Sequence, residues 1–293
     1  MSMAAKQELS YSIDANKKAV FIESDFYIPF EPNKSKPQIR YSILRMQKDL
    51  KAALNQLVVD DGEILFATYS ENDKSRFYDV ENMLFYNVGT SAFSSCCKQQ
   101  LAFMGDIERF AQKQPTDIDE RYHYAYRIVG VEELSALLSE KRVLAQWQGL
   151  PTDTGIPQSA ARYYSAIRKN SPDVYMQGTL QAGKPFGITV DITLPAECAP
   201  ASVMKPVLDG LICAFHGEAE GVDAVLEKLF GGSLTPVNQD CKRLHLFGDR
   251  NYLSQYRGAK SFKWNPEDER LQFAWIRVHK GSQAEVGGMI YEW

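Results

Sequence analysis

Two stretches of this chain recur, in the same order, in its second half. Segment 37–45 reads PQIRYSILR, and in 157–168 a Pro-Gln pair is followed by RYYSAIR. Segment 119–127 reads DERYHYAYR, and segment 268–277 reads DERLQFAWIR. Ordered self-similarity of this kind is typical of an internally duplicated chain, because each copy repeats one unit of structure. The two repeated segments, called the first and second echo below, therefore predict two related lobes, each built from helices and strands.

Length and composition fit this prediction. The 293 residues suit two domains of about 150 residues each. Hydrophobic residues make up 44% of the chain and charged residues 24%, which is typical of a globular protein with a large core. The net charge of −4 argues against broad coating of DNA, which needs many cations to neutralise phosphates, although it leaves room for a local basic groove.

The location of the protein is inferred from what the sequence lacks. Five cysteines are irregularly spaced without a C-x-x-C pair, which favours reduced thiols over disulfides or zinc. The polar N-terminus has no apolar signal-peptide core, and no apolar run approaches the ~20 residues of a membrane span. We therefore expect a cytoplasmic protein without a membrane partner, and the sequence leaves its oligomeric state open.

The hydrophobic patterns predict an α+β fold, with α/β as the alternative, in which helices flank mixed sheets. We expect a flexible lead-in at 1–21, a first lobe at 22–150 and a second lobe at 151–293. Apolar residues at three- and four-residue steps predict helices, and alternating or β-branched runs predict strands. The expected helices are 38–58, a segment opening at Asp79, 131–141, 160–169 and 199–214; the expected strands are 26–30, 64–69, 121–129, 143–147, 186–194, 271–278 and 287–293.

The spacing of the echoes also predicts an insertion. Arg162 follows Arg40 by 122 residues and Asp268 follows Asp119 by 149 residues, a difference of 27. We therefore expect about 27 extra residues in the second lobe, around 220–265.

Each half carries part of one motif on a predicted helix that follows a strand. The first half has D-x-E-N from Asp79 to Asn82, and the second has K-x-x-L-D-G-L from Lys205 to Leu211. Together they resemble the core motif of RusA-type Holliday-junction resolvases, which runs D-x-D-N, two residues, then K-x-x-L-D-x-L. The match is split: Phe85 and Gly89 replace the lysine and the later aspartate in the first half, and Ala199 and Ala201 replace the acids in the second.

The resemblance implies a metal-dependent endonuclease with Asp79, Glu81, Lys205 and Asp209 as catalytic residues. Asp79 and Glu81 would bind Mg²⁺, because carboxylate oxygens are its preferred protein ligands. A lysine would neutralise charge that develops on the phosphate. The family places a further acid downstream, for which the candidates here are Glu218, Glu220 and Asp223.

These residues also have ordinary structural interpretations. An Asp before a helix commonly caps free N–H groups, and an acid in the first turn is stabilised by the helix dipole. Lys205 and Asp209 are spaced i,i+4 and could form a surface ion pair worth a few tenths of a kcal/mol.

A second candidate site lies within the expected insertion. Between 242 and 263 basic residues alternate with aromatic ones, and Asp249 is the only acid. Basic side chains follow phosphates and aromatic rings stack on bases, so this composition is typical of binding to single-stranded or distorted nucleic acid. A solvated loop with aromatic anchors is the alternative. The candidate binding residues are Lys242, Arg243, Arg250, Tyr252, Tyr256, Arg257, Lys260 and Lys263.

The sequence thus favours a nucleic-acid-binding protein, with Mg²⁺-dependent cleavage of branched or single-stranded DNA as its expected activity if it is an enzyme. The competing hypothesis is a non-catalytic binding or scaffolding protein of a bacterial or phage-related system. The sequence does not decide whether the chain is an enzyme.

Overall fold

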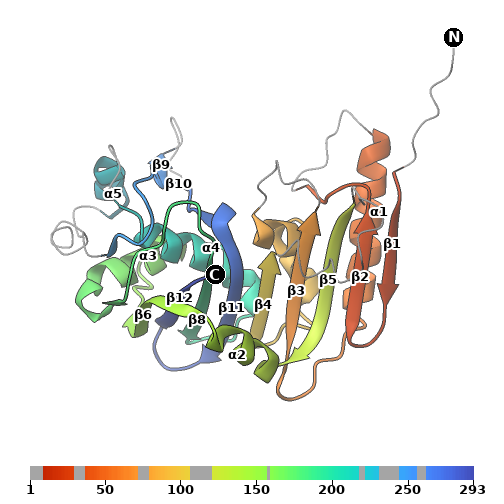
Figure 1. The fold of residues 1–293 in the computed structure, drawn as a ribbon, viewed down its shortest axis with the longest axis horizontal. Coiled ribbons are helices and arrows are strands. Elements are labelled where there is room, and N and C mark those ends of the chain that lie inside the picture. Colours follow the sequence, from red (N-terminus) through yellow and green to blue (C-terminus); the bar gives the residue numbers. More distant parts are fainter. Residues whose placement is uncertain are drawn as a thin grey trace, which may run out of the picture. The chain divides into compact units, whose positions relative to one another are not determined.

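The computed structural model describes residues 9–29, 37–71, 79–105, 121–156, 159–217, 222–230, 244–255 and 262–293. The chain divides into two compact units (Figure 1). Unit 1 comprises 1–97 and 102–133, and unit 2 comprises 98–101 and 134–293. The division falls near residue 133 and not near 150, because the strand that begins at Arg142 pairs within unit 2.

Unit 1 contains a sheet with the strand order β1-β2-β5-β3-β4. Strand β2 pairs antiparallel with β1 and β5, and β5 pairs antiparallel with β3. Helix α1 buries Ile43, Met46 and Leu50. The elements are β1 (Tyr11–Ala15), β2 (Ala19–Ser24), α1 (Pro37–Leu54), β3 (Glu63–Glu71), the π-helical turn η1 (Asn82–Tyr86), the 3-10 turn η2 (Thr90–Phe93), β4 (Gln100–Gly105) and β5 (Tyr122–Gly130).

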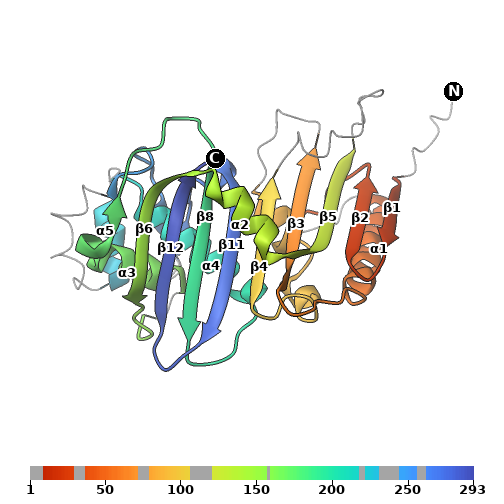
Figure 2. The same cartoon turned by 60° about the horizontal axis from the view of Figure 1, so that its bottom comes forward.

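Unit 2 contains a sheet with the strand order β11-β8-β12-β6-β7 (Figure 2). Strand β8 is parallel to β11, whereas β12 is antiparallel to both β8 and β6. The elements that follow α2 (Val131–Ser139) are β6 (Arg142–Pro151), α3 (Ser159–Lys169), the 3-10 turn η4 (Ser171–Asp173), β7 (Tyr175–Met176), β8 (Phe186–Leu194), α4 (Pro200–Ala214), α5 (Val222–Phe230), β9 (Leu253–Gln255), β10 (Phe262–Trp264), the 3-10 turn η7 (Asp268–Arg270), β11 (Leu271–Lys280) and β12 (Glu285–Glu292). Strands β9 and β10 pair with each other as a separate two-stranded sheet.

The mixed α and β architecture confirms the expected fold class. Strand β8 shows why the sequence pattern was informative: Ile188, Val190 and Ile192 are fully buried, and Thr189, Asp191 and Thr193 alternate with them on the other face. Successive strand side chains point to opposite faces, so this alternation assigns one face to the helix-covered core and the other to polar chemistry.

The two units share an order of elements. In unit 1 the chain passes from β2 to α1, β3, helical turns, β4 and β5; in unit 2 it passes from β6 to α3, β8, α4, β11 and β12. The corresponding sheets run β2-β5-β3-β4 and β6-β12-β8-β11, so matching elements occupy matching places. A duplication would produce this likeness, and the duplication itself stays a prediction.

The second sequence echo nevertheless aligns the wrong strands. It equates β5 with β11, but β5 is antiparallel to β3, whereas β11 is parallel to β8. In the shared order, β5 corresponds to β12 and β4 corresponds to β11. The predicted 27-residue insertion is therefore too short. The β3–β4 connection spans 72–99 and the β8–β11 connection spans 195–270, so the second is longer by 48 residues.

Two other expectations near the N-terminus are wrong. Residues 11–24, predicted to lie mostly in a flexible lead-in, form the β1–β2 hairpin instead. The strand expected at 26–30 is absent from the described part of that range, 26–29. Ile28 lies there in irregular backbone, where its N–H donates to the Tyr124 hydroxyl at 3.1 Å. Its apolar side chain is buried without a strand, which is why composition alone suggested one.

Candidate functional site: the two half-motifs

In unit 1 the D-x-E-N half-motif opens the helical segment that leads into η1. The main-chain carbonyl of Asp79 accepts hydrogen bonds from the N–H groups of Asn82 at 3.0 Å and Met83 at 3.1 Å. The Asp79 carboxylate accepts a hydrogen bond from Asn82 Nδ2 at 2.7 Å. The main chain of Asp79 thus begins the turn, and the asparagine of the motif holds its carboxylate.

Glu81 departs from the capping interpretation. Its side chain is only 1% exposed, whereas an acid that serves the helix dipole normally lies in solvent. Burial of a carboxylate costs free energy unless the group is paired or binds a metal. The π-helical turn follows at once, and such turns are frequent at functional sites. Asp79 and Glu81 lie in one turn and offer hard oxygen ligands of the kind Mg²⁺ prefers.

The structure explains why unit 1 lacks the second half of the motif. Phe85 stands where the family has lysine, and its ring is fully buried with its centroid 4.8 Å from that of Phe93 and 5.9 Å from that of Phe103. Gly89 replaces the family's aspartate and has φ = 100°, a conformation that residues with a side chain rarely adopt. Both positions serve the core and the turn in this unit.

In unit 2 the K-x-x-L-D-G-L half-motif lies on α4. Leu208 and Leu211 are buried in the core. A Cβ at Gly210 would lie 2.2 Å from the carbonyl oxygen of Ala160, so only glycine permits the close approach of α3 and α4. Lys205 and Asp209 remain for polar interactions, and the structure brings them together.

The ammonium group of Lys205 is held between two carboxylates. Its Nζ lies 3.1 Å from Asp209 Oδ1 and 2.9 Å from Asp268 Oδ2. The side chains of Asp209 and Asp268 are only 16% and 10% exposed, so this is more than the exposed ion pair that the i,i+4 spacing suggested. Burial raises the pKa of the nearby Cys213 thiol well above its usual value, and the charges of Asp209 and Asp268 raise it further.

The sequence analysis did not select Asp268 as a site residue. It lies in η7, directly before β11, and in the chain it begins the Asp-Glu-Arg run of the second echo. The other two residues of this turn are held by polar contacts. Glu269 forms an ion pair with Arg250 at 2.6 Å, and Arg270 donates hydrogen bonds to the carbonyl oxygens of Gln181 and Lys184. The sequence signal for Asp268 is the second echo, which begins at this residue.

The downstream acids suggested by the resemblance have no described side chains. Glu218 and Glu220 lie outside the described residues, and only the backbone of Asp223, in α5, is described. Among the described residues, Asp268 is an acid downstream of Lys205 that lies against it.

The basic and aromatic segment is described only in part. Lys242, Arg243, Tyr256, Arg257 and Lys260 lie outside the described residues. Of the others, Lys263 is exposed, and Arg250 is paired with Glu269.

Tyr252 is a core residue. It is fully buried, and its hydroxyl lies 2.8 Å from that of Tyr164. Its ring stacks on His216 with an interplanar angle of 17°. Burial raises its pKa far above the usual value. The base-stacking role predicted for Tyr252 therefore does not fit its position, because a nucleic acid base cannot reach the ring.

Comparisons with known proteins place no constraint on the chain: no protein-family model matches it, and neither the curated proteins nor the solved structures include a match. Among the described residues, no helix is both long and apolar enough to span a membrane.

Proposed function

We propose that this protein is a metal-dependent nuclease of RusA-like design that acts on branched or single-stranded DNA. One observation carries the proposal: both half-motifs lie on the helical segment that follows the same strand of the shared order, β3 in unit 1 and β8 in unit 2. A chance likeness in a few letters gives no reason for the two fragments to occupy matching places in two units. Their positions support a common functional origin for the two fragments.

The donor set in unit 1 fits a divalent cation. Asp79 and Glu81 offer carboxylate oxygens from one turn, and Asn82 fixes the orientation of the first. A bound Mg²⁺ would supply charge stabilisation for the phosphate and a more acidic bound water. The burial of Glu81 keeps competing water away from its carboxylate, which strengthens its electrostatic interactions.

Unit 2 carries a cationic group, Lys205. Lys205 would offer positive charge to a phosphate whose negative charge increases as the P–O bond breaks. Asp209 and Asp268 hold the ammonium group in place from two sides, so its position does not depend on the substrate. Their roles in this proposal are to position Lys205, and they need not contact DNA.

A non-catalytic binding or scaffolding protein, of a bacterial or phage-related system, is the second candidate. The same ion network favours it in one respect: a lysine already neutralised by two carboxylates can be a purely structural element. The two candidates differ in whether divalent cations and the motif residues matter for DNA cleavage.

The test is cleavage of labelled four-way junctions and single strands by the full-length protein in Mg²⁺. We expect Asp79→Asn, Glu81→Gln and Lys205→Met to reduce the single-turnover rate by about 100-fold or more, as is typical when one transition-state contact is removed. Asp61→Asn and Lys184→Met, at exposed positions, are the matched controls and should cleave normally. Each variant is first checked for a native unfolding transition.

Two results would overturn the proposal. One is the absence of cleavage by the wild type with any divalent cation, which together with intact DNA binding would favour the scaffolding function. The other is cleavage that the three motif substitutions leave unchanged.

A further inference from the structure

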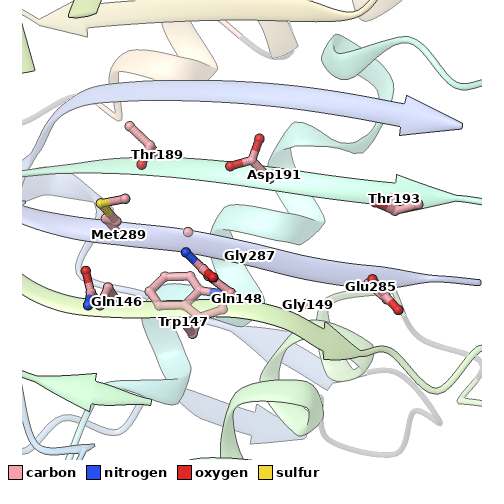
Figure 3. A pocket seen from close by; sticks show the side chains of 11 residues that line it. Gln146, Trp147, Gln148, Gly149, Thr189, Asp191, Thr193, Glu285, Gly287 and Met289 are labelled. Carbon is pink, nitrogen blue, oxygen red and sulfur yellow. The ribbon is translucent and has the colours of Figure 1, made fainter. Parts of the chain in front are cut away.

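A hollow of about 290 Å³ lies on the sheet of unit 2, on the face turned away from α4 (Figure 3). Polar side chains of three neighbouring strands surround it: Thr189, Asp191 and Thr193 from β8, Glu285 from β12, and Gln146 and Gln148 from β6. None of these residues belongs to the half-motifs, so the hollow is independent of the proposed nuclease function.

The backbone creates the hollow through a bulge and missing side chains. Val286 pairs with Leu150 and Gly288 with Trp147, so two residues of β6 oppose the single residue Gly287. One of those two, Gly149, has φ = 56°, in the left-handed region that favours glycine. Bulges of this kind are over-represented beside functional sites.

The two glycines of β12 are glycine for different reasons. A Cβ at Gly288 would lie 2.4 Å from the carbonyl oxygen of Thr189 and 2.7 Å from the Trp147 ring, so packing requires glycine there. A Cβ at Gly287 would meet nothing closer than 3.5 Å, and its φ is not positive. Neither packing nor backbone conformation requires glycine at 287.

Glycine within a strand has a cost that alanine would avoid, about 0.5–1 kcal/mol. Gly287 pairs with Asp191 on β8, and a side chain at 287 would project from the same face as the Asp191 carboxylate, into the hollow. What glycine provides at this position is therefore the empty space itself.

The charges around the hollow disfavour an anionic ligand. The Asp191 carboxylate accepts two hydrogen bonds of 2.6 Å from the Arg277 guanidinium, and His279 Nε2 lies 3.3 Å from it. The negative charge of the Asp191 carboxylate is thus compensated by the Arg277 guanidinium. The Glu285 carboxylate forms no hydrogen bond or ion pair with any described residue, so it leaves a negative, acceptor-only group at the rim.

Groups that can donate also line the hollow. Gln146 and Gln148 bring side-chain amides from β6, each with an N–H group that donates and an oxygen that accepts. A matching ligand therefore donates to Glu285 and accepts from one of these amides. Hydroxyl groups do both, whereas an ammonium group only donates.

We propose that this hollow binds a small hydroxyl-rich ligand, either a free monosaccharide or the ribose of a nucleoside. Its volume lies at the small end of ligand sites, which favours one sugar ring over a larger molecule. Gln146 and Gln148 add amide groups that can donate and accept at the rim.

The experiment measures binding of D-glucose, D-galactose, D-ribose and adenosine to the full-length protein by saturation-transfer difference NMR, with affinities from calorimetry. We expect at least one probe to bind the wild type and Gly287→Ala to weaken it at least 10-fold. Glu285→Gln should weaken the same probe. Binding by hexoses assigns the site to free sugars, and binding by ribose and adenosine alone assigns it to nucleosides.

Gly248→Ala is the matched control, because a Cβ there meets nothing within 4 Å and its φ is not positive. It should bind like the wild type. Gly287→Ala should unfold no more easily than the wild type, which separates blocked binding from lost folding. The proposal is overturned if no probe binds, or if Gly287→Ala binds with unchanged affinity.

Discussion

The substitution Lys205→Met tests how much the ion network of Lys205, Asp209 and Asp268 contributes to the stability of unit 2. It removes the cation between Asp209 and Asp268, whose side chains are 16% and 10% exposed. Breaking a buried pair costs about 3–5 kcal/mol because a buried charge is left uncompensated. Lys205 is itself 27% exposed, so solvent screens part of the interaction, and we expect a loss of about 2–3 kcal/mol.

Tryptophan fluorescence is a suitable assay for this loss. All four tryptophans of the chain lie in unit 2, at 147, 264, 275 and 293, so their unfolding transition in urea reports on the unit that contains Lys205. The matched control is Lys280→Met, which breaks an ion pair with Glu197 whose side chains are 65% and 82% exposed. An exposed pair of this kind contributes about 0–1 kcal/mol.

A double-mutant cycle with Asp268→Asn completes the test. If Lys205 and Asp268 interact as their 2.9 Å separation indicates, the two substitutions together should cost less than the sum of their separate costs, by about 1–3 kcal/mol. A Lys205→Met loss no larger than that of Lys280→Met, or additive effects in the cycle, would mean that Lys205 and Asp268 do not stabilise unit 2 together.

Three further substitutions probe the core of unit 2. Tyr252→Phe should cost about 0.5–1.5 kcal/mol in urea unfolding, because it removes the hydrogen bond between two buried hydroxyl groups. Gly210→Ala should cost about 3 kcal/mol, the upper end for overpacking, because the new Cβ would meet the backbone of Ala160. Burial lowers the pKa of His216 below 6.5, so the unfolded chain binds this proton first as the pH falls. The contribution of neutral His216 to the free energy of unfolding should therefore be fully present above pH 6.5 and decrease below it. His216→Gln should make that decrease smaller.

A different result would contradict each of these three predictions. Unchanged unfolding of Tyr252→Phe would mean that the hydroxyl pair contributes nothing. A native-like Gly210→Ala protein would mean that α3 and α4 can separate at little cost. Equal pH dependence in the wild type and His216→Gln would assign the acid-induced loss to other groups.

The sequence predicted most elements because local patterns decide them. The alternation of β-branched and polar residues placed β8 at 186–194 to the residue. Helix α3 begins and ends within one residue of its expected range, 160–169, because its apolar residues recur at helical steps. In contrast, β4 was not predicted, and the β1–β2 hairpin was assigned to a flexible segment. Strand β1 has only five residues and none of them is buried, so it offers few apolar residues that would mark a strand.

The sequence alone could not show which strand of unit 2 corresponds to which strand of unit 1. The Asp-Glu-Arg runs before β5 and β11 are alike in sequence, yet the two strands differ in direction relative to β3 and β8. Strand direction depends on pairing between distant segments, which a local resemblance does not encode.

The site was predictable only in its local parts. The spacing of Lys205 and Asp209 along a helix predicted their contact. Asp268 lies 63 residues from Lys205 in the chain, and only the fold brings the two together. The burial of Glu81 and Tyr252 likewise follows from tertiary packing, which no motif or composition reports.

Metal-dependent cleavage tests the central claim most directly. The wild type is incubated with a labelled four-way junction in Mg²⁺ and in EDTA, beside Glu81→Gln protein purified in the same way to exclude a contaminating nuclease. We expect a product that forms only with the wild type and only in Mg²⁺. An intact junction under all conditions, or equal product from Glu81→Gln, would contradict it.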